Sequence, residues 1–303
     1  MFAKKYTICL GLFFLGGLIG CHNSSFSAVA FSDTLSNKKH LLNNFEVKPY
    51  IYDSTKNYIY LTFDDGPQNG TLRCVNVCKE LGVKASFFMV GDHANSLKTK
   101  AIVATIREAY PQILLCNHST THANGHYKYF YHHPQMAAED FYRAQITLNV
   151  PYKIIRLPGN SAWVIAGKVK ASHLVDSTCI ILDSAGYNVI GWDVEWSFSH
   201  KTETPIESTQ KMINIVDSAL AKNRSHTKNH LVILSHDRMF KSPNYTDSLA
   251  KFINCTTNTH CALQFSFVSI TFIKNFLGQC GITRLKQFHN FYFNRQIYED
   301  FMN

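Results

Sequence analysis

The stretch YLTFDDGP at residues 60–67 decides how the rest of the chain is interpreted. Alternating apolar residues predict a strand that ends at a Gly-Pro turn. The strand runs into two adjacent carboxylates, Asp64 and Asp65, which repel each other unless a cation takes up negative charge. The pair therefore indicates a metal ligand in one aspartate and a free base in the other. The alternative is an Asx turn that only closes the strand.

Predicted strands and helices alternate on both sides of this stretch. We expect strands over residues 58–63, 85–90, 113–116, 153–156, 189–192, 231–235 and 265–270, and helices over 71–81, 97–110, 134–149, 176–186 and 207–223. This alternation is typical of βα units and predicts an α/β fold with a parallel sheet or barrel. In such barrels the functional residues lie where strands end.

Polar residues do follow these strands, in order. The segment HSTTH at residues 118–122 comes directly after a strand, and two histidines four residues apart on a helical turn share a face and can bind one metal. Arg156 opens the segment RLPG at 156–159 and could hold a carboxylate, while the backbone after it could donate to an oxyanion. The segment WDVEW at 192–196 could line a sugar or acyl site, although a core tryptophan pair is the alternative. His236 ends an apolar strand and could be a general acid or a cap.

Together these motifs resemble the NodB-homology polysaccharide deacetylases, carbohydrate esterase family 4, over residues 58 to 270. The resemblance implies a distorted (β/α)7–8 barrel. It implies that Asp64 is the general base and that Asp65, His118 and His122 bind a divalent metal, usually Zn²⁺. Three protein ligands with an open position are what a catalytic zinc site requires.

The resemblance also implies the remaining catalytic roles. Arg156 would hold and tune Asp64, and His236, oriented by Glu195, would protonate the leaving amine. The family usually has Asp where Glu195 stands, so Asp193 is the alternative partner of His236.

Three further residues would bind the acetyl group. The backbone N–H of Gly159 would help to stabilise the oxyanion, and Leu234 and Trp196 would line the acetyl groove. The family often has Tyr where Gly159 stands, so a wall of the groove is lost here.

The expected activity is removal of acetyl groups, N-acetyl of GlcNAc-type sugars above all, from an envelope or extracellular polysaccharide. Peptidoglycan is favoured because a lipid anchor would hold the enzyme beside it. The alternatives are an O-acetyl esterase of the xylan type and a catalytically silent glycan-binding lipoprotein. The segment at 124–133, rich in Tyr and His, is expected to be a substrate-contacting loop.

The N-terminal residues predict a targeting segment. Lys4 and Lys5 precede an apolar run at 8–19 that is too short to span a bilayer comfortably, and LIGC at 18–21 resembles a lipobox. We expect a signal at 1–21 with Cys21 acylated, which would anchor the chain to a bacterial membrane in the cell envelope. A plain secretory signal is the alternative. A tether at 22–44, a deacetylase domain at 45–276 and an extension at 277–303 complete the predicted organisation.

The composition is that of a globular protein, with 46% hydrophobic and 17% charged residues. The formal charge of +9 suggests an anionic neighbourhood of membrane headgroups, acidic glycans or nucleic acid. Nucleic acid is not expected, because the chain has no zinc-finger spacing, RNP motif or basic helix. A disulfide between Cys255 and Cys261 is expected in an oxidising compartment.

Overall fold

The computed structural model describes residues 53–257 and 265–267. The predicted signal, tether and C-terminal extension therefore lie outside the described residues, as do Cys21 and Cys261. In the described part, no helix has the length and apolar character needed to cross a bilayer. Cys255 carries a free thiol there, so its bridge to Cys261 stays a prediction.

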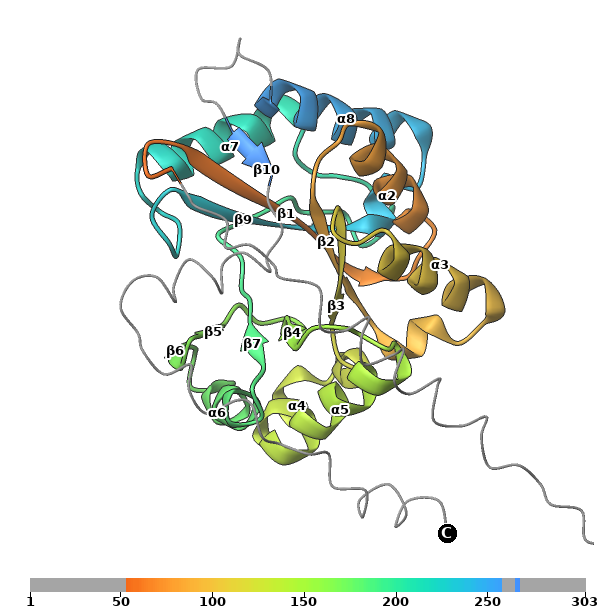
Figure 1. Ribbon diagram of the computed structural model, residues 1–303, viewed down its shortest axis with the longest axis vertical. Helices are drawn as coiled ribbons and strands as arrows, with labels where there is room; N and C mark the ends of the chain where they lie inside the picture. Colours follow the sequence, from red (N-terminus) through yellow and green to blue (C-terminus); the bar gives the residue numbers. More distant parts are fainter. Residues whose placement is uncertain (1–52, 258–264, 268–303) are drawn as a thin grey trace, which may run out of the picture. The chain divides into compact units, whose positions relative to one another are not determined.

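A ten-stranded sheet forms the centre of the described residues (Figure 1). Its order is β6-β5-β7-β4-β3-β2-β1-β9-β8, with β10 paired to the start of β1. All pairings are parallel except those that β5 makes with β6 and β7. The strands are β1 (Asn57–Gly66), β2 (Ala85–Met89), β3 (Ile113–Asn117), β4 (Ile154–Ile155), β5 (Trp163–Ile165), β6 (Lys168–Lys170), β7 (Asn188–Val189), β8 (Val194–Glu195), β9 (His230–His236) and β10 (Phe265–Phe267).

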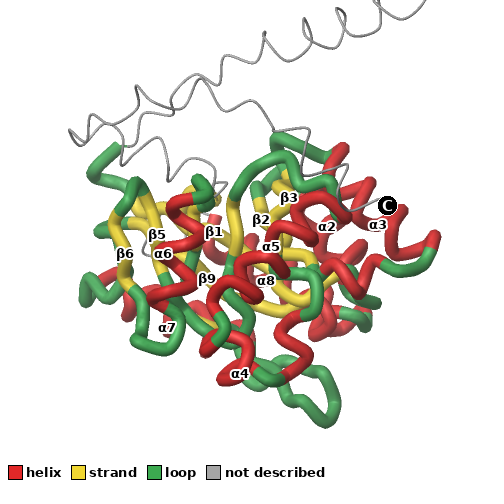
Figure 2. Tube along the Cα trace, turned by 90° about the horizontal axis from the view of Figure 1, so that it is seen from below, coloured by secondary structure: helices red, strands yellow, loops and turns green. Residues whose placement is uncertain are grey.

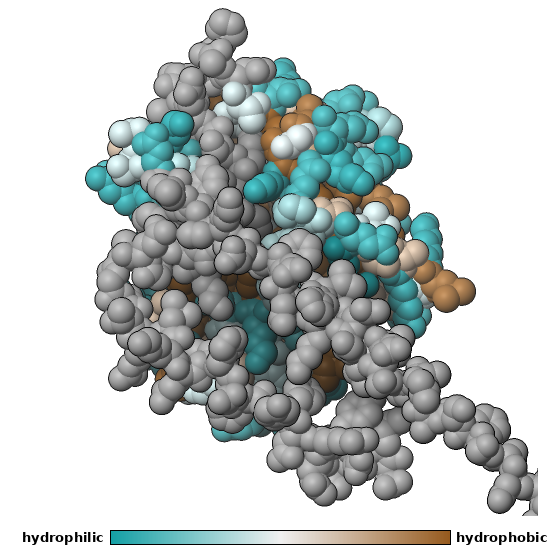
Figure 3. Space-filling model, viewed as in Figure 1, coloured by the Kyte–Doolittle hydropathy of each residue, from teal (hydrophilic) through white to brown (hydrophobic). Residues whose placement is uncertain are grey.

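Helices lie around the strands, as Figure 2 shows, and pack against the outer face of the sheet. They are α2 (Thr71–Glu80), α3 (Leu97–Glu108), α4 (Tyr127–His132), α5 (Pro134–Thr147), α6 (Asp176–Ser184), α7 (Thr209–Ala221) and α8 (Pro243–Thr257), with short 3-10 turns η1 (Gly91–Ala94), η2 (His122–Gly125) and η3 (Asp237–Phe240). In α7 the buried residues recur every three or four positions, which is the pattern of a helix with one apolar face. The surface visible over α2, α3 and α8 in Figure 3 is mostly hydrophilic, with some apolar patches.

The sheet curls around an inner apolar cluster. That cluster includes Trp163 of β5, Phe88 of β2 and Val232 of β9. The strands β5 and β9 are six places apart in the sheet order, which would separate them by about 29 Å in a flat sheet. They share one cluster because the sheet bends, so the predicted α/β class with a distorted, barrel-like sheet is confirmed.

The two faces of β1 explain how its aspartates reach the same place. Leu61 and Phe63 face the cluster beneath the helices, whereas Tyr60 faces the inner cluster. Asp64 continues the inner face by simple alternation. The pairing of β1 with β2 then shifts register between Phe63 and Gly66, and Asp65 adopts a φ of 69°. This bulge breaks the alternation, and both carboxylates point to one site.

The expected strands and helices are largely confirmed, but the segment at 124–133 is not an open loop. Most of it forms η2 and α4. The short strands β5, β6 and β8 and the helix α8 were also absent from the expectation. Strands of two or three residues are too short to show a period of two in the sequence.

Trp196 corrects a prediction. Its side chain is fully buried and packs against the rings of Phe240 and Phe252, with centroids 5.4 and 5.3 Å away. Its Nε1–H donates to the backbone oxygen of Glu207 at 2.9 Å. Trp196 therefore belongs to the core beneath the helices and does not line an open groove.

We expect Trp196→Ala to lower the free energy of unfolding by about 3–5 kcal/mol, because it removes a large buried ring from a packed core. Urea unfolding followed by circular dichroism measures this loss. The half-buried Trp192 is the matched control, and Trp192→Ala should lower the free energy of unfolding by clearly less than Trp196→Ala does. Equal stability of Trp196→Ala and the unmodified chain would contradict the core assignment.

Candidate active site

Arg156 and Asp64 form a buried ion pair at the end of the inner face. Arg156 is fully buried, and its Nη1 donates to Asp64 Oδ1 at 2.8 Å and to Thr62 Oγ1 at 2.7 Å. Its Nε and Nη2 donate to the backbone oxygens of Ile190 and Gly191. The guanidinium is thereby fixed from several sides, and the predicted contact between Arg156 and Asp64 is present.

Asp65, His118 and His122 converge beside this pair. Asp65 Oδ1 lies 3.4 Å from His118 Nε2 and 3.0 Å from His122 Nε2. One ligand atom from each of the three residues lies within 4.8 Å of the other two. His118 Nε2 is also 3.6 Å from Asp64 Oδ2, so the group lies directly against the ion pair.

The two histidines are held by a loop rather than by a helical turn, which corrects the expected geometry. His118 follows the end of β3, whereas His122 has a φ of 51° and begins η2. The buried carboxylate of Asp140 accepts from the backbone N–H groups of Thr120 (2.9 Å) and Thr121 (3.0 Å). Asp140, on α5, therefore fixes the loop that carries both histidines.

The electrostatic environment favours the charged forms of Asp65 and His118 in the metal-free site. Burial would raise the pKa of Asp65, but the neighbouring imidazoles of His118 and His122 outweigh it and hold that pKa well below its usual value. Burial would lower the pKa of His118, but the charges of Asp64 and Asp65 outweigh it and raise that pKa. The positive charge favoured on His118 thus offsets, in part, the repulsion between the carboxylates of Asp64 and Asp65.

These residues fit a divalent metal. Asp65 Oδ1 is buried and has no hydrogen-bond partner among the described residues, which is costly unless a cation faces it. The Nδ1 of His118 lies 2.8 Å from the backbone oxygen of Arg156, which favours the tautomer with Nε2 free. Two imidazoles and one carboxylate form a donor set that suits zinc.

His236 lies on the other side of Asp65. Its Nε2 is 3.8 Å from Asp65 Oδ2, and its ring packs against Phe198 with centroids 4.7 Å apart. Burial lowers the pKa of His236. Its Nδ1 is buried and has no hydrogen-bond partner in the described part of the chain.

The expected partnership of His236 with an acid is therefore not formed. Glu195 is exposed, and Asp193 is engaged elsewhere. The carboxylate of Asp193 accepts from the backbone N–H groups of His226 (2.6 Å) and Val232 (2.7 Å). The strand β8 ends with Glu195 paired to Leu234, two residues before His236.

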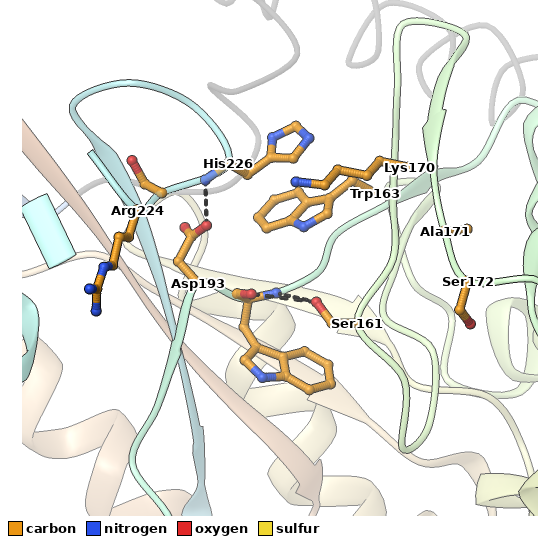
Figure 4. Close-up of a pocket in the computed structure, with 10 residues that line it drawn as sticks. Ser161, Trp163, Lys170, Ala171, Ser172, Asp193, Arg224 and His226 are labelled. Carbon is orange, nitrogen blue, oxygen red and sulfur yellow. Dashed lines mark hydrogen bonds between the residues drawn. The ribbon is translucent and has the colours of Figure 1, made fainter. Parts of the chain in front are cut away.

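Asp193 instead lines a separate cavity of about 390 Å³, shown in Figure 4. There the ring of Trp163 stacks on His226 with centroids 4.3 Å apart, and Asp193 points toward the backbone of His226. The lining contains neither of the paired aspartates nor the two candidate histidine ligands.

Gly159 and Leu234 were expected to bind the acetyl group, and that role stays a prediction. Gly159 has a φ of +66°, and a Cβ placed on it would lie 3.1 Å from Cε1 of Tyr127. The Tyr127 hydroxyl is 3.4 Å from His122 Nδ1. Tyr127, on α4, thus occupies the space beside Gly159, which the sequence left without a wall. Leu234 is buried and precedes His236 by two residues, so it shares the inner face.

Two neighbours of His236 were not predicted. Arg238 Nη2 donates to Asp65 Oδ2 at 2.8 Å. Asp237 is fully buried and accepts a hydrogen bond from the Thr71 hydroxyl, behind the turn that follows Asp65. The signal that could have found them is their place in the chain, directly after a strand-ending histidine.

Comparisons with known proteins point to one class of enzyme. Residues 52–161 match the family model described as polysaccharide deacetylase. A Bacillus subtilis protein named as a polysaccharide deacetylase, YheN, is 26% identical over 78% of this chain and 82% of its own length. The chitin disaccharide deacetylase of Vibrio alginolyticus is 25% identical over 56% of each chain. These sequence matches support a hydrolase of the deacetylase class.

Solved structures support the same fold. A carbohydrate esterase family 4 esterase of Streptococcus mutans has a TM-score of 0.52 and 21% identity, covering 71% of this chain and 92% of the other. The catalytic domain of a peptidoglycan N-acetylglucosamine deacetylase from Eubacterium rectale has a TM-score of 0.51 and 22% identity, covering 74% and 94%. These likenesses support the distorted, barrel-like α/β fold.

The buried carboxyl of Asp237 predicts a pH dependence of stability. Burial raises the pKa of Asp237 to about 7, against about 3.9 in an unfolded chain. Between these values the folded state keeps a proton that the unfolded state releases, so this group costs stability as the pH rises. We therefore expect the free energy of unfolding of Asp237→Asn, minus that of the unmodified chain, to be more positive at about pH 8 than at about pH 5. Urea unfolding at both pH values measures the difference, and a pH-independent difference would contradict it.

Proposed function

We propose that the chain is a metal-dependent deacetylase that hydrolyses the N-acetyl group of GlcNAc-type sugars in a polysaccharide. The observation that carries the proposal is the position of the Asp64–Arg156 pair directly against Asp65, His118 and His122. One carboxylate is thereby held by an arginine and the other by two imidazoles. Adjacent aspartates with different partners are suited to different tasks.

Asp64 would act as the base. Its Oδ1 is taken by Arg156, and its Oδ2 faces the cluster 3.6 Å from His118 Nε2. Oδ2 would accept a proton from the water that attacks the acetyl carbonyl carbon. Arg156 fixes the direction of that oxygen, since its guanidinium is itself held by backbone oxygens. A divalent metal held by Asp65, His118 and His122, for which the donor set favours Zn²⁺, would polarise the acetyl carbonyl.

His236 and Gly159 would serve the second half of the reaction. The tetrahedral oxyanion would accept a hydrogen bond from the backbone N–H of Gly159. His236 Nε2 would then donate a proton to the sugar nitrogen as the C–N bond breaks, releasing acetate and a free amine. Phe198, rather than an acid, packs beside the imidazole and limits its movement.

Peptidoglycan is the substrate that we favour. The argument is one of location, because acylation of Cys21 would hold the domain at a membrane beside the cell wall. Cys21 lies outside the described residues, so this envelope location is part of the proposal. The same machinery would cleave an O-acetyl ester of the xylan type, and comparison of substrates distinguishes the two.

The test is acetate release from acetylated chitin, peptidoglycan and xylan fragments. We expect release that a chelator abolishes and that Zn²⁺ restores. Asp64→Asn should lower kcat by about 10²–10⁴-fold, the usual contribution of a general base, while the bound metal is retained.

The exposed Asp247 on α8 provides the matched control, and Asp247→Asn should leave the rate unchanged. Bound zinc without acetate release from any fragment would instead favour a glycan-binding protein. Release that is insensitive to both chelator and Asp64→Asn would contradict the proposal.

A further inference from the structure

Arg238 is a second arginine at the site, and the proposed mechanism gives it no part. It lies on η3, two residues after His236, with about a fifth of its side chain exposed. Its guanidinium lies over the ring of Phe198, 5.4 Å from the centroid, and its Nε is buried without a hydrogen-bond partner in the described residues. Such a side chain is placed by packing as well as by charge.

The two oxygens of Asp65 have different surroundings. Oδ1 faces His122 Nε2 at 3.0 Å and His118 Nε2 at 3.4 Å, and it has no hydrogen-bond partner in this part of the chain. Oδ2 accepts from Arg238 Nη2 at 2.8 Å. The arginine therefore holds one oxygen and leaves the other directed at the histidines.

This division matters because a free carboxylate can rotate or bind a metal through both oxygens. A charge-assisted hydrogen bond on Oδ2 fixes the plane of the carboxylate. His118 is held in a comparable way by the backbone oxygen of Arg156. Groups that orient metal ligands in this way typically contribute 10–100-fold in metal affinity.

We propose that Arg238 is a positioning residue that holds Asp65 through Oδ2 and presents Oδ1 alone to the divalent metal. The inference rests on the proposed metal site, but not on the identity of the substrate. The positioning role and a purely electrostatic role predict opposite changes in metal affinity when Arg238 is lost. A cation beside a metal repels it, so on charge alone the loss of Arg238 would tighten metal binding.

The experiment compares zinc affinity in the full chain and its Arg238→Met variant by competition with a chromogenic chelator. We expect Arg238→Met to bind zinc at least about tenfold more weakly than the unmodified chain, with unchanged stoichiometry. The zinc affinity of Arg238→Lys should lie between those of the unmodified chain and Arg238→Met. Arg238→Gln, which keeps a polar end over Phe198, repeats the test if Arg238→Met does not fold. Thermal unfolding without zinc establishes that each variant is folded.

Lys241 provides the matched control, because it is a nearby cation paired with Glu203 at 2.6 Å. Lys241→Met should leave the zinc affinity unchanged. Zinc binding by Arg238→Met that equals or exceeds that of the unmodified chain would overturn the inference. Failure of the unmodified chain to bind zinc would instead contradict the proposed function, so the two failures are distinguishable.

Discussion

The buried ion pair between Arg156 and Asp64 is the constraint on which the rest of the site depends. Arg156 follows β4 and reaches Asp64 and Thr62 on β1, while its Nε and Nη2 bond to the backbone after β7. Its own backbone oxygen meets His118 at the end of β3. One residue thus ties together the ends of four strands, and removing one partner of such a buried pair commonly costs about 3–5 kcal/mol. Arg156 therefore fixes both the proposed base, Asp64, and one proposed metal ligand, His118.

Neighbouring aspartates on a regular strand would face opposite ways, and here a local irregularity brings them together. Asp64 stays in the strand and pairs with an arginine. Asp65 leaves it with a positive φ and turns to the histidines. A positive φ is uncommon for aspartate and persists only where the surroundings enforce it. The hydrogen bond from Arg238 and the buried turn behind Asp65 are such surroundings.

Much of this could be predicted from the sequence, because polar residues at the ends of consecutive parallel strands must meet at one mouth. That rule places Asp64, His118 and Arg156 without coordinates. It could not decide the direction of Trp196, since a tryptophan beside a short strand can face the core or the groove. The rule also expected Glu195 to orient His236, whereas the Glu195 side chain is exposed and the Nδ1 of His236 has no hydrogen-bond partner among the described residues. Arg238 and Tyr127 escaped prediction because their contacts with Asp65 and His122 depend on the tertiary fold.

The central claim is that Asp65, His118 and His122 hold a divalent metal beside Asp64. X-ray absorption at the zinc edge on the zinc-loaded chain tests it most directly. The account predicts two imidazole nitrogens at about 2.0–2.1 Å, with the remaining ligands oxygen, and loss of one imidazole in His118→Ala. A spectrum without imidazole ligands, or one that His118→Ala leaves unchanged, would contradict it.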